Sequence, residues 1–329
     1  MRFRLAVVPV LLAGLGLAAC SGAAPSDGDD ALTVVASTSA YGDIVRQVAG
    51  DSVTVESIIN KASQDPHSYE ATPQDKLTLS HADLVVANGG GYDAFIDTLT
   101  QDLGTDKADI ITAVDYSKAA HAEEESSADG HDHEDTDHGT EAGHEGHDHA
   151  AFNEHVWYDL PTAAAVATEV AKHLGELKPE EAKTFTANAK QFGDGVDALE
   201  KRLKALAPEA KGNEYAMTEP VPYYLLQGAG LSDGTPEGFS GAIEEGNDVS
   251  PLTLNTLEKK LDSGEISLLA YNAQTSSPQT ETVRTHAEKA NVPVVDFTET
   301  LPQDSDYLGW MGSNIDAIQS ALQDRVRRR

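Results

Sequence analysis

The 329-residue chain has little cysteine and little positive charge. Its one cysteine, Cys20, leaves no partner for a disulfide and no set of thiolates for an iron–sulfur or copper(I) site. Only 23 Lys and Arg residues stand against 55 Asp and Glu residues, for a net charge of −32. Such a balance argues against nucleic acid and against an anionic membrane surface as partners. It favours a soluble domain that attracts cations.

Long apolar runs are also scarce, and the clearest one lies at the N-terminus. "LAVVPVLLAGLGLAA" follows the basic "MRFR" and is short for a membrane span, so we expect residues 1–19 to be an export signal peptide. The run ends in "LAAC", which resembles the bacterial lipobox. We therefore expect Cys20 to carry lipid at the outer face of the cytoplasmic membrane, or in the periplasm, with residues 20–31 as a flexible tether. A plain signal peptide with an incidental cysteine is the alternative.

The rest of the chain alternates β-branched runs with segments of helical spacing. This alternation predicts an α/β fold made of βα units with largely parallel sheets. We expect an N-terminal lobe over residues 32–158, a helical segment over 159–210 and a C-terminal lobe over 211–329.

The longest helical pattern lies between the two predicted lobes. Pro179 suits a first helical turn, and the pattern continues to about Ala207. Gly193 and Gly195 lie inside this helix and are expected to weaken or bend it.

An insertion over residues 119–150 interrupts the first lobe. It is rich in histidine and acid and has almost no apolar side chain, so it should be disordered. We expect its imidazoles to form weak, exchanging sites that gather zinc, although a solvated linker is the plain alternative. The seven histidines are His121, His131, His133, His138, His144, His147 and His149.

Four candidate metal ligands follow predicted strands. They are His67 in "QDPHSYEATPQD", His155 in "NEHVWYDLPT", Glu219 in "MTEPVPYY" and Glu299 in "DFTETLP". Strand ends of parallel sheets face a common edge, and each lobe supplies two of the four, so we expect a site in the cleft between lobes. Imidazoles and carboxylates suit zinc or manganese. Any one of the four alone is more often an ordinary loop residue. Trp157 and Tyr69, beside the two histidines, are expected to be packing walls.

Together with "MTEPVPYYLLQGAGL" and "VPVVDFTETLP", the two histidine motifs resemble the zinc/manganese ABC-transporter solute-binding lipoproteins from about Leu32 to the C-terminus. The resemblance implies a monomer with two α/β lobes, a rigid linking helix and one metal between the lobes. It implies His67 and His155 as ligands, and Glu219 at a position that is His in zinc binders and often Glu in manganese binders. The fourth position is usually Asp, so Glu299 departs from the pattern and Asp296 is the reserve candidate.

The residues of the predicted site and of the insertion favour different ions. Two carboxylates favour manganese, whereas the histidine-rich insertion and the order of metal affinities favour zinc, which we predict. The expected function is capture of zinc for a membrane permease driven by a cytoplasmic ATPase. A surface adhesin or metal buffer without transport is an alternative. A secreted metallohydrolase is disfavoured, because four protein ligands leave no position for a catalytic water.

Overall fold

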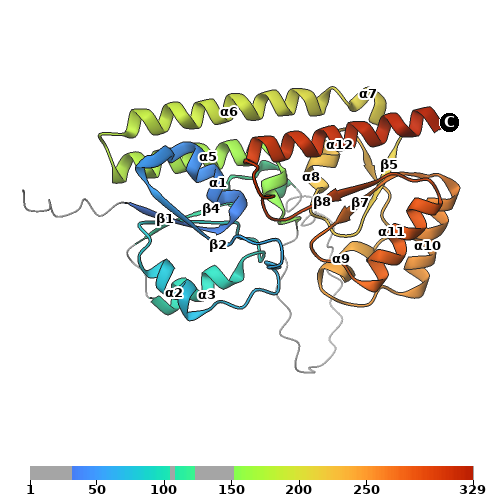
Figure 1. The fold of residues 1–329 in the computed structure, drawn as a ribbon, viewed down its shortest axis with the longest axis horizontal. Helices are drawn as coiled ribbons and strands as arrows, with labels where there is room; N and C mark the ends of the chain where they lie inside the picture. Colours follow the sequence, from blue (N-terminus) through green and yellow to red (C-terminus); the bar gives the residue numbers. More distant parts are fainter. Residues whose placement is uncertain (1–31, 104–107, 123–151, 329) are drawn as a thin grey trace, which may run out of the picture. The chain divides into compact units, whose positions relative to one another are not determined.

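The computed structural model describes residues 32–103, 108–122 and 152–328, which carry two parallel four-stranded sheets (Figure 1). The first sheet has the order β2-β1-β3-β4, with β1 at Thr33–Thr38, β2 at Thr54–Ile59, β3 at Leu84–Ala87 and β4 at Asp109–Thr112. The second has the order β6-β5-β7-β8, with β5 at Glu214–Met217, β6 at Ser232–Asp233, β7 at Ile266–Asn272 and β8 at Val294–Phe297. The predicted α/β fold with two parallel sheets is confirmed.

Helices connect and cover the strands. The first half contains α1 (Ser39–Ala49), α2 (Pro73–Ser80), α3 (Ala94–Leu103), the short 3-10 turn η3 (Val156–Tyr158) and α5 (Leu160–Leu177). The second half contains α6 (Ala182–Lys204), α7 (Ala207–Ala210), α8 (Tyr223–Gly228), α9 (Phe239–Glu244), α10 (Pro251–Ser263), α11 (Pro278–Lys289) and α12 (Tyr307–Arg328). Because helices lie on both faces of the sheets, β3 and β7 are buried along their whole length, as is usual for parallel strands.

One hydrophobic core runs through both lobes. It includes Val34 and Val86 of the first sheet and Leu268 and Ala270 of the second. Two smaller clusters cover the opposite faces of the sheets, one in each lobe. Residues 32–329 accordingly form one compact unit by their contacts, and the domain boundaries within this unit remain predictions.

The long helix α6 joins the two lobes. It packs against α1 and α5 of the first half and against α8 and α12 of the second (Figure 1). Its buried side chains recur at helical spacing and are Phe185, Ala189, Phe192, Val196, Leu199 and Leu203. Apolar contacts therefore hold α6 to both lobes along its length.

The glycines of α6 do not interrupt it, since the helix is continuous across Gly193 and Gly195. A Cβ at Gly195 would lie 2.7 Å from Cδ1 of Leu308, whereas a Cβ at Gly193 would meet nothing within 4 Å. Gly195 thus allows α12 to approach α6 closely. The predicted weakening or bending of the helix at these glycines is therefore not seen as a break, because α6 is supported at Gly195 by its packing against α12.

Several sequence predictions fall outside the described residues: the signal peptide, Cys20, the tether, and six of the seven insertion histidines, all but His121. Ala120 is buried in the core, so ordered structure extends beyond the predicted start of the insertion at residue 119. His121 is exposed, and its Nε2 lies 3.3 Å from the carbonyl oxygen of Asp115. Within the described ranges, no helix is both long and apolar enough to cross a bilayer.

The two glycines of α6 should respond differently to alanine. Gly193→Ala is expected to raise the free energy of unfolding by about 0.5–1 kcal/mol, because alanine favours the helix and has free space there. Gly195→Ala gains the same propensity but must displace Leu308, and such overpacking costs about 1–3 kcal/mol. Urea unfolding followed by circular dichroism measures both changes. Equal effects of the two substitutions would contradict the close packing of α12 on Gly195.

Candidate metal centre

His67 lies in the loop between β2 and α2. Its backbone N–H donates to Oδ1 of Asp65 at 3.0 Å, which fixes the loop around it. Its ring packs edge-to-face on Tyr92, with 5.0 Å between centroids. The side chain is 11% exposed, so His67 lies at the boundary between the buried site and solvent.

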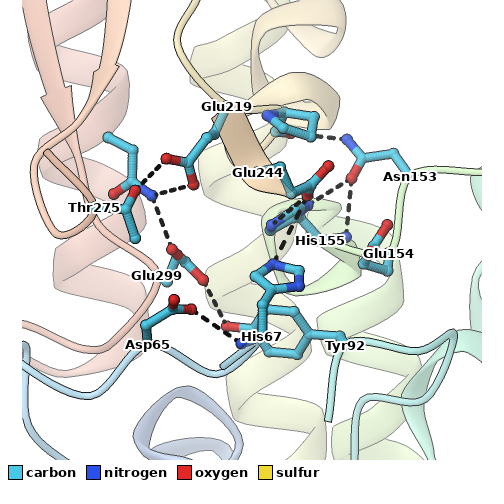
Figure 2. Close-up of polar contacts among 12 residues, drawn as sticks. Asp65, His67, Tyr92, Asn153, Glu154, His155, Glu219, Glu244, Thr275 and Glu299 are labelled. Carbon is cyan, nitrogen blue, oxygen red and sulfur yellow. Dashed lines mark hydrogen bonds and ion pairs between the residues drawn. The ribbon is translucent and has the colours of Figure 1, made fainter. Parts of the chain in front are cut away.

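His155 lies directly before η3 and is fully buried. Its Nδ1 lies 2.7 Å from Oδ1 of Asn153, and its backbone N–H donates to the same oxygen at 3.0 Å. The amide of Asn153 donates in turn to the carbonyl of Pro220 at 2.8 Å, so this side chain connects the first lobe to the second (Figure 2). Because Oδ1 is an acceptor, the ring proton lies on Nδ1 and the lone pair of Nε2 is directed into the site.

Aromatic side chains hold the two imidazoles in place. Trp157 lies 5.1 Å from the ring of His155 and 4.4 Å from that of Tyr92, between centroids. Tyr69 instead packs on Phe95 at 5.0 Å and donates to Asp75. Tyr92 therefore supplies the second aromatic wall that the sequence analysis assigned to Tyr69.

Glu244, the last residue of α9, completes a group of three donors. Its Oε1 lies 3.7 Å from Nε2 of His67 and 3.7 Å from Nε2 of His155 (Figure 2). These separations are too long for hydrogen bonds. Two ligands that each lie about 2.0–2.1 Å from one ion can be up to roughly 4 Å apart, so the spacing suits a shared ion. Oε1 is buried and has no hydrogen-bond partner among the described residues.

Glu219 and Glu299 follow β5 and β8 and are also buried at the site, with 2% and 1% exposure. Nδ2 of Asn272, at the end of β7, donates to Oε2 of Glu219 and to Oε1 of Glu299, each at 2.8 Å. Thr275 donates to the other oxygen of Glu219, and Tyr92 donates to the other oxygen of Glu299 at 3.2 Å. Each of these four carboxylate oxygens therefore already accepts one hydrogen bond from the protein.

Asp296, the reserve candidate, lies elsewhere. Its carboxylate is half-exposed and pairs with the guanidinium of Arg284 at 2.8 Å. The structure thus brings Glu299 to the histidines and gives Asp296 a structural partner.

Buried like charges shift the acid strengths at this site. Burial, and next Glu154 and Glu219, raise the pKa of Glu244 to about 9. Burial and the nearby Glu219 raise the pKa of Glu299 to about 8, and burial raises the pKa of Glu219 as well. A divalent cation among these carboxylates would remove the repulsion, so the site favours such an ion.

A cleft of about 700 Å³ leads to the site. His67, Glu219 and Glu244 line it, together with residues 245–248 and 274–279 of the second lobe. Lysine and arginine are absent from its lining in the described part of the chain. The approach to the two imidazoles is therefore polar and acidic, as a path for a cation requires.

Glu244 and Asn272 are not among the site residues predicted from the sequence. Glu244 lies in "GAIEEGND", which carries no histidine or proline signature. It ends a six-residue helix that follows a two-residue strand, and both elements are too short to give a periodic pattern. The one available signal was the adjacent pair of acids before a glycine. Asn272 ends β7, and an inspection of every strand end would have included it.

Comparisons with known proteins identify the family of this chain. A model of the ZnuA family, zinc-uptake complex component A periplasmic, matches residues 34–321. The manganese ABC transporter substrate-binding lipoprotein scaA of Streptococcus gordonii is 27% identical over 332 residues, covering 96% of this chain and 97% of that protein. The zinc-binding lipoprotein AdcA of Streptococcus pneumoniae is 25% identical, and the match covers 94% of this chain and 59% of AdcA.

Solved structures share the fold. The SBP FpvC from Pseudomonas aeruginosa in complex with Mn²⁺ matches with a TM-score of 0.68 at 21% identity, covering 89% of this chain and 98% of that chain. The laminin-binding protein Lmb of Streptococcus agalactiae matches with a TM-score of 0.67 at 18% identity, covering 88% and 99%. At these identities the likeness shows the fold alone.

The family match extends across both lobes and includes every residue of the candidate site. Its members are solute-binding proteins and not enzymes. The chain therefore belongs to the zinc-uptake complex component A family and is a metal ABC transporter substrate-binding protein.

Proposed function

We propose that this protein captures Zn²⁺ between its lobes and delivers it to the membrane permease of an ABC transporter. The observation that carries the proposal is the convergence of His67, His155 and Glu244, whose donor atoms lie within 4.8 Å of one another. Zinc prefers imidazole and carboxylate donors in a small coordination shell. Glu219 and Glu299 are the further proposed ligands, through lone pairs that do not accept the hydrogen bonds of Asn272, Thr275 and Tyr92.

Manganese is the second candidate for the cargo. Three carboxylates, Glu219, Glu244 and Glu299, lie beside only two imidazoles, and an oxygen-rich shell suits Mn²⁺. The relatives include proteins described as binding manganese and one described as binding zinc. Zinc is preferred here because a mixed nitrogen and oxygen site binds Zn²⁺ more tightly than Mn²⁺.

The proposal includes the partners expected from the sequence. A permease with its cytoplasmic ATPase would receive the ion, and lipid on Cys20 would keep the protein at the outer face of the membrane as a monomer. The insertion histidines would gather zinc near the cleft. Lmb is described as bifunctional, with adhesin and metal-transporting activity, but that likeness concerns the fold, so no adhesin role is proposed.

Loss of a central ligand should abolish tight binding. In the chain without residues 121–149, we expect one tight zinc equivalent, and His155→Ala should weaken it by more than the roughly 10–100-fold typical of second-shell changes. Glu244→Gln should weaken it in the same direction. The exposed Glu237→Gln is the matched control and should change nothing. Competition against a chromogenic chelator measures the affinities, and unchanged binding in both site variants would overturn the proposal.

Zinc binding should release protons at pH 7. Since the pKa of Glu244 is about 9, the metal-free protein holds its proton at this pH, and coordination must displace it. Zinc affinity should therefore rise with pH up to about 9. Calorimetry at pH 7 in buffers of different ionisation enthalpy counts the released protons. Wild type should release about one more proton than Glu244→Gln, with Glu237→Gln equal to wild type; identical counts in all three would contradict a protonated Glu244 that zinc deprotonates on binding.

A further inference from the structure

The end of β7 holds the two carboxylates that follow β5 and β8. Asn272 is 2% exposed, and both of its donated hydrogen bonds go to carboxylates, one to Glu219 and one to Glu299. Its Oδ1 accepts the backbone N–H of Gln274 at 3.0 Å. A flipped amide would direct a carbonyl oxygen at both carboxylates, so only one orientation satisfies all of these groups.

The backbone of Asn272 is fixed as firmly as its side chain. Its N–H donates to Oγ1 of Thr218 at 2.9 Å, directly before Glu219. The strand end is also paired in the sheet, where Asn272 lies opposite Phe297, two residues before Glu299. Asn272 therefore lies between the two carboxylate-bearing loops and holds them at one separation.

We call the pair of hydrogen bonds from Asn272 to Glu219 and Glu299 the clamp, and the next residues extend it across the cleft. Thr275 donates to the second oxygen of Glu219. Oε1 of Gln274 accepts the backbone N–H groups of Glu299 and Thr300, while its Nε2 donates to the carbonyl of Ala62 at 2.9 Å, in the loop that leads to His67. One short segment thus positions both carboxylates and connects them to the other lobe.

We infer that Asn272 is a positioning residue that sets the metal selectivity of the site by holding Glu219 and Glu299 together as oxygen donors. The inference rests on the proposed function, in which the cargo lies among these groups. Two anionic carboxylates remain side by side only if donors or a cation compensate their repulsion. Asn272 supplies the donors and leaves the outer lone pairs for a metal.

The two candidate ions should depend on this clamp to different degrees. His67, His155 and Glu244 have no hydrogen bond to Asn272, so a zinc ion held by these three keeps its principal ligands when the clamp is lost. Manganese requires more oxygen ligands and depends on Glu219 and Glu299. Loss of Asn272 should therefore weaken manganese binding much more than zinc binding.

The experiment compares Asn272→Leu with Asn255→Leu in the full chain. Asn255 is an exposed asparagine of α10 that does not line the cleft. Electron paramagnetic resonance of free Mn²⁺ gives the manganese affinity, and displacement of bound Mn²⁺ by Zn²⁺ gives the zinc affinity. Asn272→Leu should weaken manganese binding about 10–100-fold, as is typical when a residue that orients ligands is lost, and zinc binding by less than about threefold. Asn255→Leu should change neither affinity.

The ratio of the two affinities distinguishes a positioning role of Asn272 from a general structural defect, because such a defect would weaken the binding of both ions equally. Equal losses, or no loss, would overturn the inference. Thr275→Val removes only the donor to Glu219 and should shift the ratio in the same direction by less, which keeps the test available if Asn272→Leu does not fold. If wild type binds neither ion in the cleft, the proposed function itself fails.

Discussion

The constraint on which this structure depends is a group of carboxyl groups between two lobes, which ionise only at a high electrostatic cost because burial and mutual repulsion raise the pKa values of Glu244 and Glu299. Glu219, Glu244 and Glu299 converge there, and Glu154 adds to the field at Glu244. In the described cleft no lysine or arginine neutralises them. Hydrogen bonds from Asn272, Thr275 and Tyr92 stabilise Glu219 and Glu299, and the imidazoles face Glu244. A divalent cation suits this arrangement, because it compensates the carboxylates and accepts the imidazole lone pairs at once.

The scaffold keeps these groups at fixed positions. A continuous core and the helix α6 connect both sheets, so a wide hinge rotation would have to separate packed apolar surface. Hydrogen bonds also cross between the lobes close to the site. Tyr158 donates to the carbonyl of Thr298 at 2.7 Å, and Tyr307 donates to the carbonyl of Trp157 at 2.6 Å. The frame positions His67 and His155 from two loops and Glu244 from one short helix around a common point, which is the preorganisation that metal capture needs.

The sequence predicts much of the fold because its strands and helices are long enough to carry clear periodicity. The α/β class follows from that periodicity alone, and the His67 motif lies in the loop that follows β2, as predicted. His155 instead lies directly before η3, far along the chain from the end of β4. What could not be predicted depends on tertiary contacts. Glu244 comes from a six-residue helix after a two-residue strand, and Gly195 serves packing against Leu308 rather than a bend. Asn272 has no signature of its own and acquires its role only from the two carboxylates that the sheet brings beside it.

A crystal structure of the zinc-loaded protein with anomalous data at the zinc absorption edge tests the central claim most directly. The account predicts one strong peak within about 2.0–2.2 Å of Nε2 of His67, Nε2 of His155 and a carboxylate oxygen of Glu244. Such a peak would place the cargo where the three donors converge. A peak bound by Glu219 and Glu299 without either imidazole, or no peak in the cleft, would contradict it.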